Sequence, residues 1–96
     1  TWNNAGVNFN AFTVNVTDNA STTISTLGTF AIAGVPALTV VKNGAILQAG
    51  IAFADLGTPA NGSEIYCPNC APASDPCTGA STGAKAFRRN GAWSCF

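Results

Sequence analysis

The chain has 96 residues, with four Lys and Arg against four Asp and Glu, and it contains no His. A chain of this length forms at most one domain of ordinary size. Charged residues make up 8% of it, against about 25% in typical globular domains. The sparse, balanced charge offers no basic surface for phosphate groups, so no nucleic-acid partner is expected.

The absence of His also excludes whole classes of active site. Ser-His-Asp triads, Cys-His pairs and His metal ligands all need an imidazole. A glycosidase needs two carboxylates that converge, and the four here stand apart in the sequence: Asp18, Asp55, Glu64 and Asp75. We therefore expect that the chain is not an enzyme. The longest weakly polar run, residues 30–41, is too short for a membrane-spanning helix, so no membrane insertion is expected.

The first predicted element is a β-strand in "VNFNAFTVNVT", residues 7–17. Apolar and polar side chains alternate there with the period of two that strands show. The phase of the alternation slips between Ala11 and Phe12, and a slip of one residue would turn every later side chain to the other face. A β-bulge or corner near Ala11–Phe12 is the expected solution. Residues 21–34 are rich in β-branched residues and favour further strands.

Two hairpins are predicted next along the chain. In "ALTVVKNGAILQAG", residues 37–50, two apolar runs flank Asn43-Gly44. This dipeptide favours a two-residue type I′ turn, which would pair Val41 with Ile46 and Val40 with Leu47. After a short strand through Ile65 and Tyr66, Asn90-Gly91 predicts a second such turn, pairing Arg88 with Trp93 and Ala86 with Cys95.

The elements together predict an all-β chain, a meander of short strands with no helix of ordinary length. Residues 1–60 are expected to form a shaft-like module of strands, and residues 61–96 a small cysteine-rich C-terminal cap. Strands built from Asn, Thr and Ala give a thin core and open edges, which favours association with further copies. Closed cyclic symmetry would end such association.

The cap contains all four cysteines: Cys67, Cys70, Cys77 and Cys95. A redox C-x-x-C normally opens a helix that lowers the thiol pKa, and here the motif lies in a proline-rich loop. A zinc site formed by all four cysteines is an alternative, although its usual signature is two C-x-x-C pairs. Two disulfides are the preferred interpretation, because the cap is too small to fold on its own core. We prefer the pairing Cys67–Cys95 with Cys70–Cys77, and no bound cofactor.

Three residues of the cap are candidates for a binding surface: Tyr66, Arg88 and Trp93. Exposed aromatic rings next to arginine would suit a carbohydrate or a protein partner. The alternative is that the aromatic side chains build the small core of the cap. Three N-x-Ser/Thr sequons, at Asn15, Asn19 and Asn61, leave glycosylation open.

Two stretches of the sequence resemble a known family. The opening "TWNNAGVNFNAFTVNVTDNAS" and the end "IYCPNCAPASDPCTGASTGAKAFRRNGAWSCF" resemble segments of bacteriophage tail fibre and tailspike-like virion proteins. The resemblance implies a β-rich homotrimer in a virion, either intertwined or packed side by side. It also implies a structural and receptor-binding role in attachment to the host surface. Two alternatives from other classes are a secreted carbohydrate-binding or adhesin domain, and a subunit of an extracellular filament.

Overall fold

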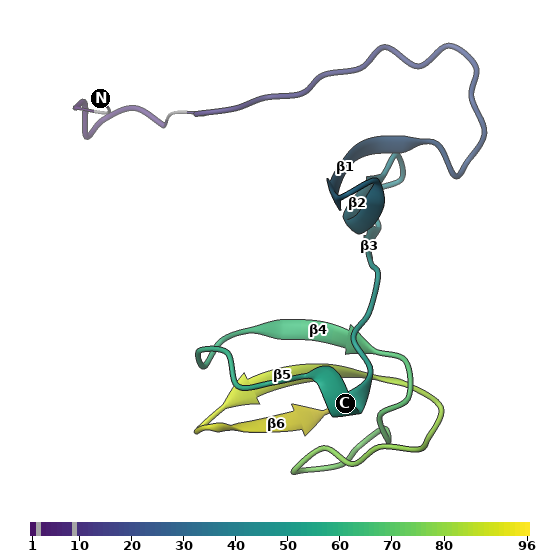
Figure 1. Cartoon of the computed structure of the whole chain (residues 1–96). Helices are drawn as coiled ribbons and strands as arrows, with labels where there is room; N and C mark the ends of the chain where they lie inside the picture. The colour runs from purple at the N-terminus through teal and green to yellow at the C-terminus, as the bar shows by residue number, and fades with distance from the viewer. Residues whose placement is uncertain (2, 9) are drawn as a thin grey trace.

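A computed structural model describes residues 1, 3–8 and 10–96, and the fold is all-β (Figure 1). The first antiparallel sheet has the order β1-β2-β3 and consists of β1 (Thr26–Ile32), β2 (Val35–Val41) and β3 (Ile46–Gln48). The second has the order β4-β5-β6 and consists of β4 (Glu64–Cys67), β5 (Ala84–Arg89) and β6 (Ala92–Cys95). A single 3-10 turn, η1 (Phe53–Asp55), lies between the two sheets in the chain. The predicted fold class is thereby confirmed.

The strand predicted over residues 7–17 is not formed in the part of the chain that the structure describes. Residues 10–17 follow an extended path without strand pairing (Figure 1), and Phe12 is 85% exposed. Alternation gives a segment the side-chain pattern of a strand, but a strand also needs a neighbour for its backbone groups. No strand is paired with this segment among the described residues, so the predicted bulge near Ala11–Phe12 has no ladder in which to form. Trp2 of the quoted motif and Phe9 of the predicted strand lie outside the described residues.

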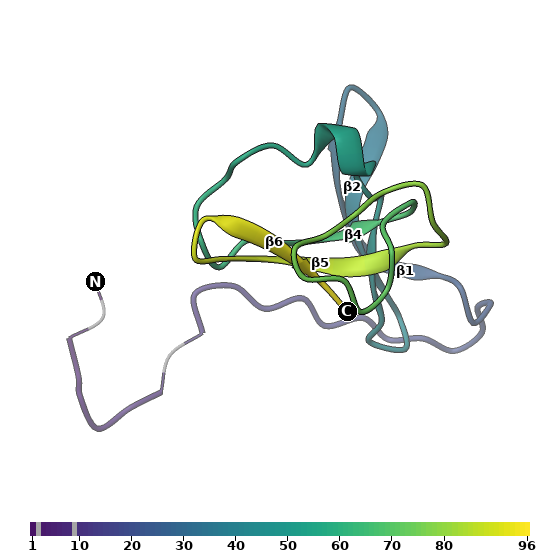
Figure 2. The same ribbon diagram turned by 90° about the horizontal axis from the view of Figure 1, so that it is seen from below.

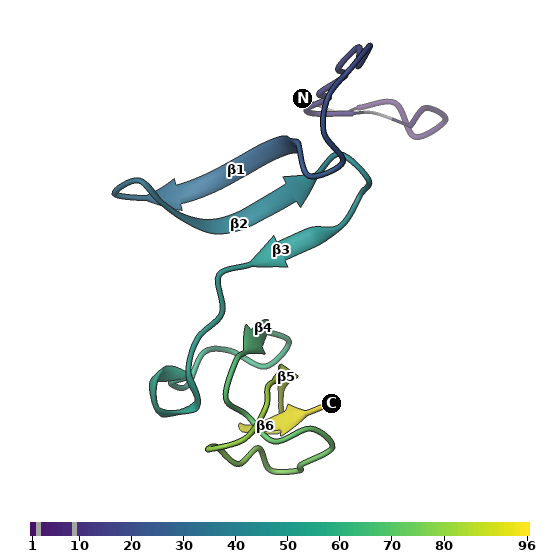
Figure 3. The ribbon, with the colours of Figure 1, turned by 90° about the vertical axis from the view of Figure 1, so that its right-hand side faces the viewer.

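A two-residue turn that the sequence analysis missed joins β1 to β2 (Figure 3). Ile32 pairs with Val35, and the two turn residues, Ala33 and Gly34, have φ values of 50° and 80°. Positive φ at both positions defines the type I′ turn, whose twist matches that of the flanking strands. Ala is uncommon at such a position, which explains why the dipeptide gave no hairpin signal.

The predicted hairpin at Asn43-Gly44 is present, but its register differs from the prediction by one residue. Val40 pairs with Ile46, and the Val41 amide donates a 2.9 Å hydrogen bond to the Ala45 carbonyl. Of the dipeptide, only Gly44 has a positive φ, 91°, so a type I′ turn does not form. The loop has three residues instead, the next most common hairpin length. The predicted pairs of Val41 with Ile46 and of Val40 with Leu47 are therefore wrong.

The second predicted hairpin agrees with the structure. Asn90 and Gly91 have φ values of 52° and 73°, as a type I′ turn requires. Arg88 pairs with Trp93, and Ala86 with Cys95. The resulting β5–β6 hairpin supplies two of the three strands of the second sheet (Figure 2).

Hydrogen bonds connect the two sheets where the chain passes from one to the other. The Tyr66 amide in β4 donates to the Gln48 side-chain oxygen at 2.8 Å, and the Ile51 amide donates to the Tyr66 carbonyl at 2.9 Å. The radius of gyration is 17.4 Å, whereas a compact domain of this length has a value of about 12–13 Å. The chain therefore leaves much of its surface uncovered.

The buried core lies almost entirely in the second sheet and its loops. Its members are Leu56, Cys67, Cys70, Cys77, Ala84, Ala86 and Cys95, with Ile65 and Trp93 packed against them. In the first sheet Thr39 is buried, while Phe30 is 69% exposed and Ile32, Val35 and Ile46 are exposed as well. The cap has a core of its own, and the first sheet lacks one among the described residues. The predicted boundary between residues 1–60 and 61–96 stays a prediction.

Candidate functional site

The two disulfides of the cap join different cysteines from those predicted. Cys67 is bonded to Cys70, and Cys77 to Cys95. The predicted Cys67–Cys95 bond fails because β5 lies between β4 and β6. Two strands in such positions are about 10 Å apart, whereas the Cα atoms of a disulfide lie within about 7 Å of each other. The predicted pairing, Cys67–Cys95 with Cys70–Cys77, is therefore corrected.

The C-x-x-C segment is a turn closed by the Cys67–Cys70 disulfide, and it holds η1 in place. Cys67 and Cys70 are both 0% exposed, so a substrate disulfide cannot reach their sulfurs, as a redox centre requires. Between them, the Asn69 side-chain oxygen accepts a 2.8 Å hydrogen bond from the amide of Phe53 in η1. The segment thus fixes the preceding turn against the cap.

Zinc was the alternative use of these cysteines. Zinc binds thiolates, and each cysteine sulfur in the structure is bonded to another sulfur. Across residues 1, 3–8 and 10–96, no three His, Cys, Asp or Glu side chains are grouped as a metal site would need. With all four sulfurs in disulfides, no thiolate is left to bind zinc.

The register of the second sheet separates the three candidate binding residues. Paired residues share a face of the sheet, and neighbours along a strand alternate between faces. Arg88 pairs with Trp93 and so shares its face. Tyr66 pairs with Lys85, an odd number of residues from Arg88, and lies on the opposite face. The structure brings Arg88 and Trp93 together and leaves Tyr66 apart from them.

Arg88 and Trp93 hold a loop over the inner face of the sheet. The Arg88 guanidinium carbon lies 5.9 Å from the centroid of the Trp93 ring, within the range of a cation–π contact. The Trp93 indole N–H donates to the Gly57 carbonyl at 2.9 Å, and the Arg88 Nε donates to the Pro59 carbonyl at 3.1 Å. Their polar groups are used within the chain, which favours a structural role for this pair.

On the opposite face, three side chains form a row that crosses all three strands. Tyr66 pairs with Lys85, and the Phe96 amide donates to the Lys85 carbonyl at 2.9 Å. We call Tyr66, Lys85 and Phe96 the outer row. Tyr66 is 45% exposed and Phe96 63%, and strand spacing puts their Cα atoms about 10 Å apart. Lys85 also forms a 3.5 Å ion pair with Glu64 in the neighbouring position.

Phe96 is the member of the outer row that the sequence analysis missed. It follows Cys95 directly, so the alternation along β6 places it on the face opposite the buried cysteine. The predicted register of the Asn90-Gly91 hairpin, continued by one residue, would have paired it with Lys85.

A second polar cluster of the cap joins the loop before Cys77 to the hairpin. The Ser94 hydroxyl donates to Asp75 Oδ1 at 2.9 Å and accepts from Arg89 Nε at 3.1 Å. Arg89 Nη2 donates to Asp75 Oδ2 at 3.0 Å. The Ser94 hydrogen bond first, and the Arg89 hydrogen bond second, lower the pKa of the Asp75 carboxyl from its usual 3.8. The cluster favours the ionised form of the Asp75 carboxyl and attaches its loop to β6.

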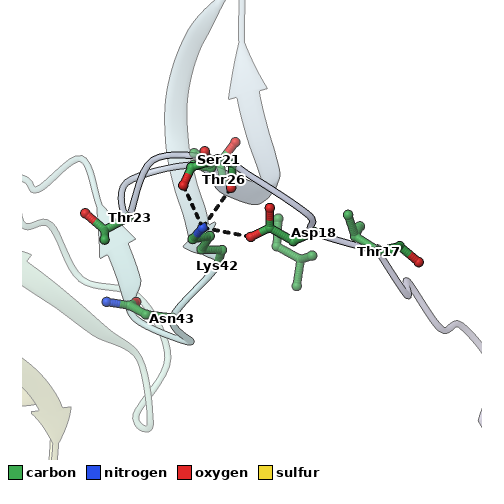
Figure 4. Close-up of a pocket in the computed structure, with 10 residues that line it drawn as sticks. Thr17, Asp18, Ser21, Thr23, Thr26, Lys42 and Asn43 are labelled. Atoms are coloured by element: carbon green, nitrogen blue, oxygen red, sulfur yellow. Dashed lines mark hydrogen bonds and ion pairs between the residues drawn. The ribbon is translucent and has the colours of Figure 1, made fainter.

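A hollow lies at the start of the first sheet (Figure 4). It is open, has a volume of about 640 Å³ and surrounds Lys42. The Lys42 ammonium donates to Asp18 Oδ2 at 2.7 Å, to the Ser21 hydroxyl at 2.7 Å and to the Ser21 carbonyl at 3.1 Å. The Lys42 hydrogen bond is the main cause of a lowered pKa of the Asp18 carboxyl, and Ser21 adds to it. These three hydrogen bonds use all three ammonium donors of Lys42 and attach Asp18 and Ser21 to the first sheet. We call these contacts the Lys42 clasp.

Comparisons with known proteins do not assign the chain to a family. No family model, no curated protein and no solved structure matches the chain. Nor do the described residues contain a helix with the length and apolar character needed to cross a bilayer. The two disulfides are typical of proteins that fold or persist in oxidising surroundings.

Proposed function

We propose that the chain is a self-associating structural module of a virion fibre or tailspike, a homotrimer whose cap faces a receptor on the host surface. The observation that carries the proposal is the uncovered apolar face of the first sheet. The sequence resemblance to phage fibre proteins supports the virion setting, and the two disulfides suit a particle that persists outside cells.

The strand pairing defines this apolar face. Phe30 pairs with Leu38, Ile32 with Val35, and Val40 with Ile46. Residues two apart on a strand share a face, so the six side chains form one surface, the apolar face: Phe30, Ile32, Val35, Leu38, Val40 and Ile46. Of these, Phe30, Ile32, Val35 and Ile46 are exposed. Burying one such side chain contributes about 1.5–3 kcal/mol, which favours a covering copy.

Native mass spectrometry of the full chain, with light scattering at micromolar concentration, tests self-association. We expect a trimer, and Phe30→Asp should raise its dissociation constant by about 30-fold or more, because a carboxylate enters an apolar contact. Phe96→Asp is the matched control, since it changes a similarly exposed phenylalanine outside the apolar face, and it should leave the trimer intact. A monomeric wild-type chain would refute the proposal, and an open helical polymer in negative stain would select the filament alternative.

The outer row favours a second function, carbohydrate binding by the cap. Exposed aromatic rings stack on the apolar faces of sugars, and Lys85 with Glu64 supplies polar groups beside them. On a glycan array, Tyr66→Ala and Phe96→Ala should abolish binding, whereas Phe30→Ala, outside the row, should preserve it. Binding that survives both changes in the outer row would exclude this surface.

A further inference from the structure

Residues 10–17 have the pattern of a strand but no strand beside them. We call this segment the arm. Its even-numbered side chains, Phe12, Val14 and Val16, are apolar and exposed, and they alternate with Thr13, Asn15 and Thr17. Among the described residues, no backbone hydrogen bond involves the arm. An extended segment with one apolar row and free backbone groups is suited to join an existing sheet.

The first sheet offers an edge for such a segment. In the order β1-β2-β3, β1 has a neighbour on one side only within the described part of the chain. An unpaired edge presents a row of amide and carbonyl groups to any extended segment that reaches it. β1 has seven residues, and the arm has eight, so the two match in length.

The side-chain patterns of the arm and of β1 also match. Gly28, Phe30 and Ile32 alternate along β1 with Thr29 and Ala31. An arm paired with β1 would place its Phe and Val side chains beside Phe30 and Ile32, and its Thr and Asn side chains beside Thr29 and Ala31. The apolar face would thus gain a fourth strand, because both partners carry one apolar and one polar side.

Among the described residues, the arm is not paired with its own β1. The Lys42 clasp holds Asp18 and Ser21, at the point where the arm meets the rest of the chain (Figure 4). Beyond it, Phe12 and Val14 line an open hollow of about 260 Å³ that they share with residues 27–30 of the first sheet, without a backbone hydrogen bond between the two segments. The backbone groups of the arm therefore remain available to a partner strand.

We infer that the arm of one copy adds as a strand to the open β1 edge of a second copy of this chain. The inference rests on the proposed self-association and specifies how it occurs. Each copy then donates one arm and accepts one, and such an arrangement closes into a ring when the rotation between copies permits.

Val14→Pro in the full chain tests the exchange. Proline removes an amide from the centre of the arm and is not tolerated inside a paired strand. Among the described residues that amide has no hydrogen-bond partner, so the fold of the cap should persist, as measured by its amide protection. The dissociation constant of the oligomer should rise about tenfold or more. Ala5→Pro adds the same ring outside the arm and should leave the oligomer unchanged.

Each outcome of this comparison decides the inference. An oligomer that is unchanged by Val14→Pro would overturn arm exchange while leaving self-association standing. Dissociation by Ala5→Pro as well would also overturn the assignment to residues 10–17. A monomeric wild-type chain would overturn the inference and the proposed function together.

Amide hydrogen exchange on the wild-type chain is an independent measurement. Amides of residues 10–17 and of β1 should be protected in the oligomer and lose that protection together on dilution to monomer. Protection of the arm that persists in the monomer would mean that it pairs within its own chain, which would overturn the inference.

Discussion

Asp75 illustrates how single side chains hold the cap. It lies in the loop before Cys77 and accepts hydrogen bonds from the buried Ser94 and from Arg89. The backbone after Asp75 is also bonded to β6, since the Cys77 amide donates to the Trp93 carbonyl at 2.8 Å. The side-chain and backbone contacts together bring the loop along the outer edge of β6.

The lowered pKa of Asp75 predicts a dependence of cap stability on pH. A carboxyl whose folded pKa lies below its unfolded value stabilises the fold above the unfolded value, and the stabilisation is lost as pH falls through the folded value. The thermal midpoint of the wild type should exceed that of Asp75→Asn above pH 3.8, and the difference should shrink on further acidification.

The matched control for this titration is Asp18→Asn. Asp18 also has a lowered pKa, but it contacts Lys42 at the first sheet, so its loss should not change amide protection in the cap. A difference between wild type and Asp75→Asn that stays constant down to pH 2 would contradict the assigned role of the Asp75 carboxylate.

At the scale of the elements, turn chemistry decided which sequence predictions succeeded. Asn90-Gly91 predicted its turn and register correctly, because both residues adopt positive φ. At Asn43-Gly44 the same dipeptide formed a longer loop, in which the Asn43 side chain accepts a 3.0 Å hydrogen bond from the Ala45 amide. Local sequence therefore located both hairpins but fixed only one register, since the other depends on contacts that the dipeptide does not determine.

The turn between β1 and β2 gives a prediction of its own. Ala33 has a φ of 50°, where Asn is several-fold more common than Ala. Ala33→Asn should therefore raise the free energy of unfolding by about 0.5–1 kcal/mol in urea titrations. Ala45→Asn, in the neighbouring hairpin but without positive φ, should give no gain. A destabilised Ala33→Asn variant would count against the type I′ turn.

The disulfides predict different costs of removal. Cys77–Cys95 closes a separation of 18 residues and Cys67–Cys70 one of 3, which gives about 3 and about 2 kcal/mol in the loop-entropy model. The Cys77→Ala/Cys95→Ala variant should therefore be the less stable of the two double variants in urea titrations. The opposite order would contradict the model for this cap.

Peptide mapping without reduction tests the pairing itself. Cleavage before Asp and after Lys and Arg separates Cys67 and Cys70 from Cys77, and Cys77 from Cys95. We expect residues 75–85 linked to residues 90–96, with Cys67 and Cys70 together in an unlinked peptide. A species in which all three peptides are linked would contradict the pairing Cys67–Cys70 with Cys77–Cys95.

The candidate site was only partly accessible to sequence reasoning. The cap was recognised from its four cysteines, and Tyr66 was singled out as an exposed aromatic residue. Their partners depend on strand order, because β5 separates Cys67 from Cys95 and the register sends Tyr66 and Trp93 to opposite faces. Strand order is a long-range property, which spacing along the chain does not determine.

At the scale of the whole molecule, the two sheets differ in what stabilises them. The cap has buried residues and two disulfides, whereas the first sheet leaves its apolar face uncovered. Binding to the folded state raises apparent stability with concentration. The stability of the first sheet should therefore depend on copies of the chain, and that of the cap should not.

Hydrogen exchange at several protein concentrations measures this difference. The opening free energy of amides in β1–β3 should rise by about 1.4 kcal/mol for each tenfold rise in free partner concentration above the dissociation constant. That of amides in β5 and β6 should stay constant. Equal concentration dependence in both sheets would mean that the molecule opens as a single unit.

Both edge strands of the second sheet, β4 and β6, already bond to other parts of the same chain. Tyr66 in β4 already bonds to Gln48 and Ile51, and β6 already bonds to the loop before Cys77. Further strands cannot attach at these positions without displacing parts of the same chain. The proposed strand addition therefore belongs to the first sheet and not to the cap. In the proposed assembly the cap would add no strand of its own, and its outer row would stay exposed to a partner of another kind.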